Sequence, residues 1–156
     1  MEATDWDERY RSQELVWSVE PNRFVAAEAA GLPPGRALDV AAGEGRNAIW
    51  LASRGWRVTV VDFSEVGLAK GWRLAQDAGV AERIDWVRSD LRRWEPPGPE
   101  YDLVVVAYLH LPAEALARIL TEAASAMRPG GSVIAVGHDR AHLACGVGGP
   151  QDPAVL

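Results

Sequence analysis

A glycine-rich turn between an apolar run and an amphipathic stretch is the part of this sequence best suited to chemistry. The segment 39–48 reads Asp-Val-Ala-Ala-Gly-Glu-Gly-Arg-Asn-Ala, which predicts a strand, a turn and the start of a helix. Glycine lets a ligand approach the backbone closely, and a helix N-terminus offers free N–H groups to a negatively charged group. Gly43, Gly45 and Ala48 also satisfy the dinucleotide-binding pattern G-x-G-x-x-G/A. The pattern alone leaves open a turn whose glycines serve only tight packing.

A carboxylate at the end of the next apolar run gives this turn a more specific meaning. Asp62 closes the run 57–62, and the carboxyl ends of neighbouring parallel strands lie at one edge of a sheet. There the side chain of Asp62 can accept hydrogen bonds from both hydroxyls of a ribose. Taken alone, it is equally well explained as a solvated turn aspartate. Together, Asp62 and the glycine turn predict a site for a ribose-bearing cofactor.

The elements that must position these residues follow from an alternation of short apolar runs and longer amphipathic stretches, which is typical of βαβ units around a parallel sheet. We expect five strands, at 36–42, 57–62, 83–88, 101–108 and 132–137. We expect helices at 21–30, 46–54 and 65–78, the last capped by Ser64. A further helix should start at Pro112, end before Pro129 and carry one apolar face made of Leu116, Ile119, Leu120, Ala123 and Met127. The segment 144–153 is expected to be a loop.

Composition and charge exclude several classes of protein. The chain has 156 residues, 48% hydrophobic and 24% charged, which indicates one folded domain. Its net charge of −6 argues against nucleic acid as a partner. The single cysteine, Cys145, and three scattered histidines suit neither a disulfide nor a zinc-binding array, so we expect no metal and a reducing compartment. The polar N-terminus and the lack of a long apolar run favour a cytoplasmic location without membrane contact.

At the glycine turn and several further motifs, the sequence resembles the class I S-adenosylmethionine-dependent methyltransferases. Segment 39–45 is similar to their first motif, and Asp62 to their ribose-binding acid. Further matches are Ser89-Asp90-Leu91 at the adenine turn, 101–105 at the fourth strand and 127–131 at the turn before the fifth, so that the resemblance runs from about Trp6 to Gly137. Segment 43–47, the arm at 6–10 and Pro21-Asn22 are most similar to the small-molecule branch that includes the tellurite-resistance and thiopurine methyltransferases.

The resemblance implies an α/β fold, a Rossmann-like doubly wound sheet that is mainly parallel, with the strand order 3-2-1-4-5. It implies one methyltransferase-like domain over 1–156, with an N-terminal arm or lid at 1–20, a cofactor-binding core at 36–137 and a loop tail at 138–156. The family usually adds strands 6 and 7 after the fifth. No strand-like run follows Gly137, so we expect a truncated form or a partner that completes the fold.

The implied function is transfer of a methyl group from S-adenosyl-L-methionine to a small-molecule acceptor. Asp39 would organise the glycine turn and can bind the methionine ammonium, Phe63 would pack against adenine, and Asp90 with the Leu91 backbone would read the adenine amino edge. The expected cofactor-binding residues are Asp39, Ala41, Gly43, Gly45, Asn47, Asp62, Phe63, Ser64, Asp90, Leu91, Ala107, Trp17 and Tyr10. Two alternatives stay open: a non-catalytic S-adenosylmethionine-binding or assembly module, and an NAD-dependent oxidoreductase that uses the same glycine turn.

Candidates for the catalytic step follow the fourth strand. Tyr108 and His110 should lie at the carboxyl edge of the sheet, where open α/β sheets bind their ligands. His110 is either an acid or base or a loop residue whose hydrogen bonds are satisfied, and we prefer it to His138 and His142. A base is optional, because a thiolate acceptor has no proton to lose, whereas an alcohol or amine benefits from one.

Two surfaces have alternative explanations. The aromatic arm with Trp6, Tyr10 and Trp17 is either a lid over the donor or a segment pinned to the core by its rings. The fifth strand leaves an apolar edge at 133–136, which predicts that two copies pair there as a homodimer unless the tail covers that edge.

Overall fold

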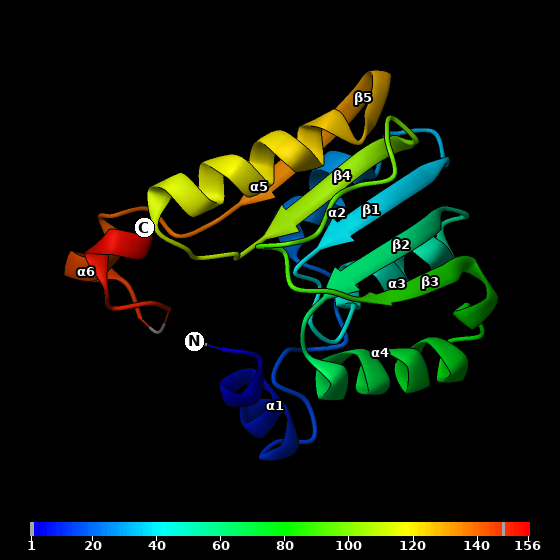
Figure 1. Cartoon of the computed structure of the whole chain (residues 1–156). Helices are drawn as coiled ribbons and strands as arrows, with labels where there is room; N and C mark the ends of the chain where they lie inside the picture. Colours follow the sequence, from blue (N-terminus) through cyan, green and yellow to red (C-terminus); the bar gives the residue numbers. More distant parts are fainter. Residues whose placement is uncertain (1, 148) are drawn as a thin grey trace.

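A five-stranded parallel sheet forms the centre of the molecule (Figure 1). The computed structural model describes residues 2–147 and 149–156. The strands are β1 (Arg36–Val40), β2 (Arg57–Asp62), β3 (Ile84–Arg88), β4 (Tyr101–Ala107) and β5 (Met127–Val136), in the order β3-β2-β1-β4-β5. Each neighbouring pair is parallel. The predicted Rossmann-like α/β sheet and its strand order are confirmed.

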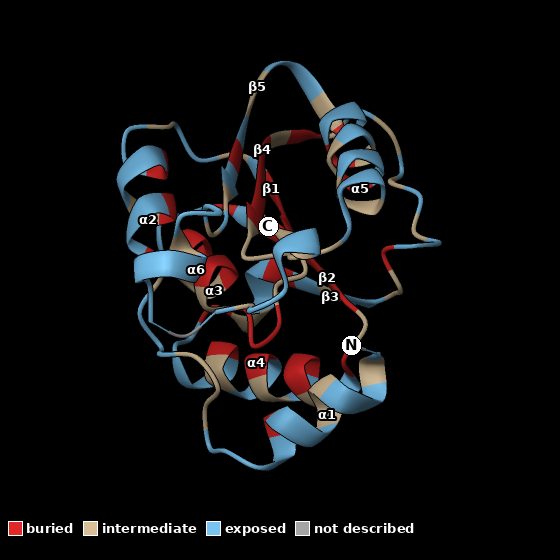
Figure 2. Cartoon of the chain, turned by 90° about the vertical axis from the view of Figure 1, so that its left-hand side faces the viewer, coloured by how far each residue is buried: buried red, intermediate tan, exposed pale blue. Residues whose placement is uncertain are grey.

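Helices cover both faces of this sheet (Figure 2). Three of them, α2 (Arg23–Ala29), α3 (Arg46–Ser53) and α4 (Glu65–Asp77), lie on one face, and α5 (Ala113–Ser125) lies on the other. Successive residues of β1 point to opposite sides: Ala37 joins the core on the α2–α4 side, and Leu38 joins the core under α5. Because both faces are covered, the inner strands are mostly apolar between their ends.

Local sequence explains where the elements begin and end. The side chain of Ser64 accepts a hydrogen bond from the Gly67 N–H and caps α4 as predicted. Asn22 caps α2 in the same way through the N–H groups of Phe24 and Val25. The first strand ends at Val40, two residues before the predicted boundary, because Ala41 has a φ of +57° and leaves the extended conformation.

The fifth strand begins earlier than predicted. α5 ends at the cap residue Ala126, and Met127 pairs with Tyr101 as the first residue of β5. Met127 therefore lies in a strand and not on the apolar face of the helix. The register shifts between Tyr101 and Leu103, where the Pro-Gly-Gly turn at 129–131 is accommodated. Glycine fits closely at 131, because a Cβ there would lie 3.1 Å from two backbone carbonyl oxygens.

Both terminal segments contain structure that the sequence analysis missed. The N-terminal arm forms α1 (Ala3–Arg11), which begins with a capping box between Glu2 and Asp5 and packs beside α4. The tail, expected to be a loop, contains α6 (His142–Cys145) and the 3₁₀ turn Pro153–Val155. No strand follows β5 in the part of the chain that the structure describes. None of the described helices is long and apolar enough to cross a bilayer.

Candidate functional site

The glycine turn joins β1 to α3 at the carboxyl edge of the sheet. Gly43 and Gly45 have φ values of +57° and +71°, a region that favours glycine. A Cβ at Gly43 would lie 2.3 Å from the Tyr10 hydroxyl oxygen, and one at Gly45 would lie 2.6 Å from the ring of Trp86. The sequence predicted that a ligand could approach the backbone of this turn closely. In this structure the groups that lie close to it are the aromatic side chains of Tyr10 and Trp86.

Asp62 holds the end of β2 against this turn. Its side chain is buried, with Oδ2 accepting a hydrogen bond from the Gly43 N–H and Oδ1 accepting one from the Ser64 N–H, both at 2.8 Å. Burial raises the pKa of the Asp62 carboxyl, and these backbone donors oppose the rise. Each carboxylate oxygen has two lone pairs, so both can accept a further hydrogen bond from a ligand hydroxyl.

Asp39, next to the turn on β1, is the most unusual charged group of the site. It is 1% exposed, and it accepts a hydrogen bond from the backbone of Ala48 in α3. Its Oδ2 atom has no hydrogen-bond partner among the described residues. Burial raises the pKa of Asp39 to about 7, with Asp62 adding to the rise and Arg46 opposing it. A buried carboxylate with a free oxygen is suited to a cationic partner such as an ammonium.

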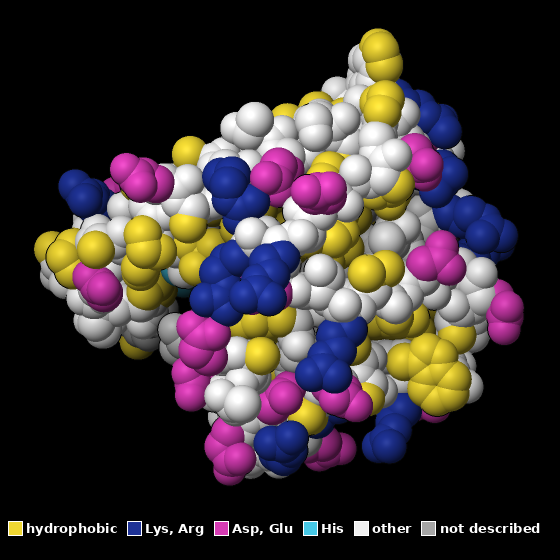
Figure 3. All heavy atoms as spheres, viewed as in Figure 1, with side chains coloured by type: hydrophobic (Ala, Val, Ile, Leu, Met, Phe, Trp, Pro, Cys, Tyr) yellow, Lys and Arg dark blue, Asp and Glu magenta, His cyan; other side chains and the backbone are white. Residues whose placement is uncertain are grey.

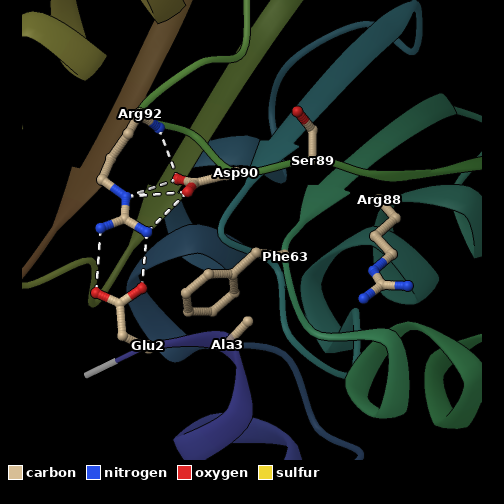
Figure 4. Close-up of a pocket in the computed structure, with 7 residues that line it drawn as sticks. All are labelled: Glu2, Ala3, Phe63, Arg88, Ser89, Asp90 and Arg92. Carbon is tan, nitrogen blue, oxygen red and sulfur yellow. Dashed lines mark hydrogen bonds and ion pairs between the residues drawn. The ribbon is translucent and has the colours of Figure 1, made fainter.

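A pocket of about 380 Å³ opens at the carboxyl ends of β2 and β3 (Figure 4). It is lined by Glu2, Ala3, Phe63, Arg88, Ser89, Asp90 and Arg92. The Phe63 ring lies between the arm and Asp90. Three of the expected cofactor-binding residues therefore lie at or beside this pocket, since Leu91 directly follows Asp90. The side chain of Leu91 is buried in the core under α5, and its carbonyl accepts a hydrogen bond from Arg118.

One charged group closes the pocket toward the N-terminal arm. The Arg92 guanidinium binds the Glu2 carboxylate through two contacts of 2.8 and 3.1 Å, and its Nε lies 3.0 Å from both oxygens of Asp90. The same guanidinium lowers the pKa of the Asp90 carboxyl. Arg92 therefore links α1 to the adenine turn that the resemblance implies.

The arm is fastened to the glycine turn by two residues that the sequence analysis did not single out. Glu44 is 2% exposed and accepts hydrogen bonds from the N–H groups of Val16 and Trp17 at 3.0 to 3.2 Å. Lys70 lies 3.5 Å from Glu44 and donates to the carbonyls of Tyr10, Gln13 and Glu14. The signal in the sequence was weak: an acid between two glycines, and the only lysine in the chain.

The remaining expected cofactor-binding residues have partners within the protein. Tyr10 is buried, its hydroxyl lies 3.5 Å from the Trp17 indole nitrogen, and burial raises the pKa of that hydroxyl. Asn47 accepts a hydrogen bond from the Asn22 N–H at 2.8 Å, and Ser64 donates to Asp7 of α1. Ala41 lies in the glycine turn, and Ala107 ends β4. Of the two explanations for the aromatic arm, these contacts favour a segment pinned over the turn.

Tyr108 and His110 lie after β4, where the structure gathers all three histidines of the chain. The His110 Nε2 atom lies 3.0 Å from Nδ1 of His138, and the ring of His138 lies 4.5 Å from that of His142 and 4.8 Å from that of Tyr108. Tyr108 has a φ of +58°, uncommon for a residue with a side chain. Within the described residues, no group of three or more His, Cys, Asp or Glu is arranged to hold a metal ion.

Comparison with known proteins places this arrangement in a family. The family described as "Methyltransferase domain" matches residues 37–131. A phosphatidylethanolamine N-methyltransferase of Cereibacter sphaeroides is 31% identical over 121 residues, which are 78% of this chain and 59% of that protein. A demethylmenaquinone methyltransferase of Clavibacter sepedonicus is 31% identical over 120 residues, 76% of this chain and 46% of that protein. The chain thus spans about half the length of these curated relatives.

A solved structure agrees with the sequence relatives. DhpI in a complex with SAM and HEP is 25% identical to this chain and aligns with a TM-score of 0.67, covering 90% of this chain and 67% of that one.

Proposed function

This chain belongs to the methyltransferase domain family, and on that premise we propose that it is an S-adenosylmethionine-dependent methyltransferase that acts on a small-molecule acceptor. The observation that carries the proposal is the pocket at the ends of β2 and β3, which is lined by Phe63 and Asp90. Open α/β sheets bind ligands in the crevice outside the carboxyl ends of their strands.

The residues present fit this cofactor at three points. The pocket beside Phe63 suits the adenine ring, whose amino group would share the Asp90 carboxylate with Arg92. Asp62 has lone pairs left for the ribose hydroxyls. The buried, unpartnered Oδ2 of Asp39 suits the methionine ammonium, which would satisfy it.

When bound, S-adenosylmethionine supplies a methyl carbon attached to a positively charged sulfur. The chain's own residues have to hold the donor and acceptor in line and exclude water from between them. The pinned arm supports this view, because Glu44 and Lys70 hold Tyr10 and Trp17 over the turn, where they shield its outer side. We place the protein in the branch that includes tellurite-resistance and thiopurine methyltransferases, supported by segment 43–47 and by the arm that packs on it.

Titration calorimetry tests the cofactor. S-adenosylhomocysteine should bind the unmodified protein, and Asp62→Ala should weaken binding, whereas the control Asp85→Ala, which removes an exposed carboxylate from β3, should leave it unchanged. Binding of NAD in place of S-adenosylhomocysteine would favour the oxidoreductase alternative. Cofactor binding with no methyl transfer to any small-molecule probe would favour the non-catalytic module.

We also propose that the outer edge of β5 pairs with a second copy of the chain. The sheet ends at β5 in the described part of the chain, and Val133 on this strand is 40% exposed. Ile134 is buried in the core, so a lysine there would unfold the protein, and Val133→Lys is the cleaner probe. Light scattering should show a dimer that Val133→Lys converts to a monomer. The single cysteine supports our expectation of a reducing compartment, the cytoplasm.

A further inference from the structure

The cluster of Tyr108 and the three histidines contains an ordered hydrogen-bond chain. The N–H of His138 donates to Nε2 of His110 at 3.3 Å, so this Nε2 carries a lone pair and no proton. The other ring nitrogen of His110 must then hold the proton, in agreement with the hydrogen bond between His110 and the Tyr108 backbone. The ring of His110 is therefore fixed as one tautomer by two backbone groups.

The fixed tautomer of His110 determines that of His138. Nδ1 of His138 lies 3.0 Å from Nε2 of His110, and because Nε2 carries no proton, Nδ1 must donate to it, sharing its lone pair with the His138 backbone N–H. A neutral imidazole ring carries only one N–H proton, which in His138 is then on Nδ1, so Nε2 of His138 keeps its lone pair. Of the two rings, His138 is the one with a basic nitrogen that this hydrogen bond leaves available.

The ring of His138 is partly exposed, and the C-terminal segment packs against its Nε2 atom. A Cβ at Gly149 would lie 2.9 Å from this nitrogen, and a glycine, whose φ there is +70°, avoids that contact. The C-terminal segment with α6 and the arm with α1 lie on either side of the carboxyl edge of the sheet, and the surface is hollowed between them (Figures 1 and 3). Burial and the neighbouring His142 lower the pKa of His138, which favours the neutral ring.

From this geometry we propose that His138 accepts the proton of the methyl acceptor through Nε2, that His110 is its positioning residue, and that the acceptor carries an O–H or N–H group. The inference rests on the proposed function. The acceptor's proton passes to Nε2, and the electron pair that held it attacks the methyl carbon. The C–S bond breaks with its electron pair staying on sulfur, which leaves the sulfur uncharged. His138 becomes an imidazolium and returns the proton to water.

Imidazole NMR tests the proton positions without any ligand. The chain has three histidines, so the nitrogen spectrum contains three rings, assignable with single substitutions. Both His110 and His138 should be protonated at Nδ1 at neutral pH. His110→Ala should leave His138 as a mixture of tautomers, and His110→Gln should restore one tautomer, since its side-chain oxygen can accept from Nδ1. Protonation of His138 at Nε2 in the unmodified protein would overturn the proposal.

Chemical labelling and turnover test access and role. Diethylpyrocarbonate, which reacts with an accessible neutral imidazole nitrogen, should modify His138 faster than His110. With catechol as the O–H probe and thiophenol as the thiol probe, His138→Gln should lower kcat for catechol by about 100-fold or more and that for thiophenol by about threefold or less. Equal losses for both probes, or slower labelling of His138, would contradict the proposal. Failure of S-adenosylhomocysteine to bind the unmodified protein would instead refute the proposed function.

Discussion

Replacement of Asp39 by asparagine separates the cost of its buried charge from its role in binding. The carboxyl is 1% exposed, and its pKa is raised to about 7 from an ordinary value of 3.8. The folded state thus holds the proton more tightly than the unfolded chain. Stability from this group is fully present below about pH 4 and is lost as the pH rises toward and through 7. Asparagine has the same shape, keeps an oxygen for the Ala48 N–H and never ionises.

The size of the effect follows from the two pKa values. They differ by about three pH units, and one unit corresponds to about 1.4 kcal/mol, so the ionised Asp39 costs the folded state up to ~4 kcal/mol above about pH 8. Asp39→Asn should remove this cost. This gain grows with pH only between the two pKa values and is constant above the higher one. About two of the three pH units between them lie above pH 5, so the gain in unfolding free energy should grow by about 3 kcal/mol from about pH 5 to about pH 8.5.

Urea unfolding of the two proteins at these two pH values measures the gain directly. Asp85→Asn is the matched control, because Asp85 is exposed on β3 and its loss should give no pH-dependent gain. S-adenosylhomocysteine should bind Asp39→Asn about 10- to 100-fold more weakly, as expected when a hydrogen bond to a charged group is lost. A gain in stability of equal size at both pH values would show that Asp39 ionises normally and refute the reasoning.

Three other perturbations test the site and its cover. Asp62→Ala should weaken S-adenosylhomocysteine binding by ~1.5 to 3 kcal/mol in calorimetry, and binding within twofold of the parent would remove Asp62 from the site. Gly43→Val should destabilise the fold and displace Tyr10, because the valine side chain would meet the Tyr10 hydroxyl and residue 43 has a positive φ. The displacement should be seen as increased tyrosine exposure, and an unchanged melting temperature would contradict this prediction. Glu44→Gln should speed proteolysis of the arm at Gln13 to Val16 several-fold, because the charge that holds Lys70 is lost; equal cleavage rates would show that the arm is held elsewhere.

The sheet was predictable because each strand is specified by its own residues. The run 57–62 is β-branched at 58–61 and became β2 without any change of boundary, and Ser64 caps the next helix from one position away. The glycine turn was predictable for the same reason, since its conformation depends on residues within a few positions of Gly43 and Gly45. Local signals of this kind need no knowledge of distant contacts.

The contacts of the arm and of the histidine cluster could not be predicted in this way. Glu44 binds backbone N–H groups of residues 16 and 17, which any residue type other than proline can supply. His138 meets His110 because β5 lies beside β4 and each histidine lies just after the carboxyl end of its strand, although the two are 28 positions apart in the sequence. The spacing Trp6 to Tyr10, by contrast, is one helical turn, a signal for α1 that the sequence does contain.

The contacts that hold the arm also constrain the order in which the chain acquires its structure. The arm is synthesised before its partners, which lie 57 to 90 positions further along the chain: Ser64 for Asp7, Lys70 for Tyr10 and Arg92 for Glu2. Closing loops of this length costs entropy that only later contacts repay, so the arm is made well before the residues that fix it in place. During synthesis its aromatic rings stay exposed until β2 and α4 have folded, and apolar surface exposed in this way is prone to aggregation.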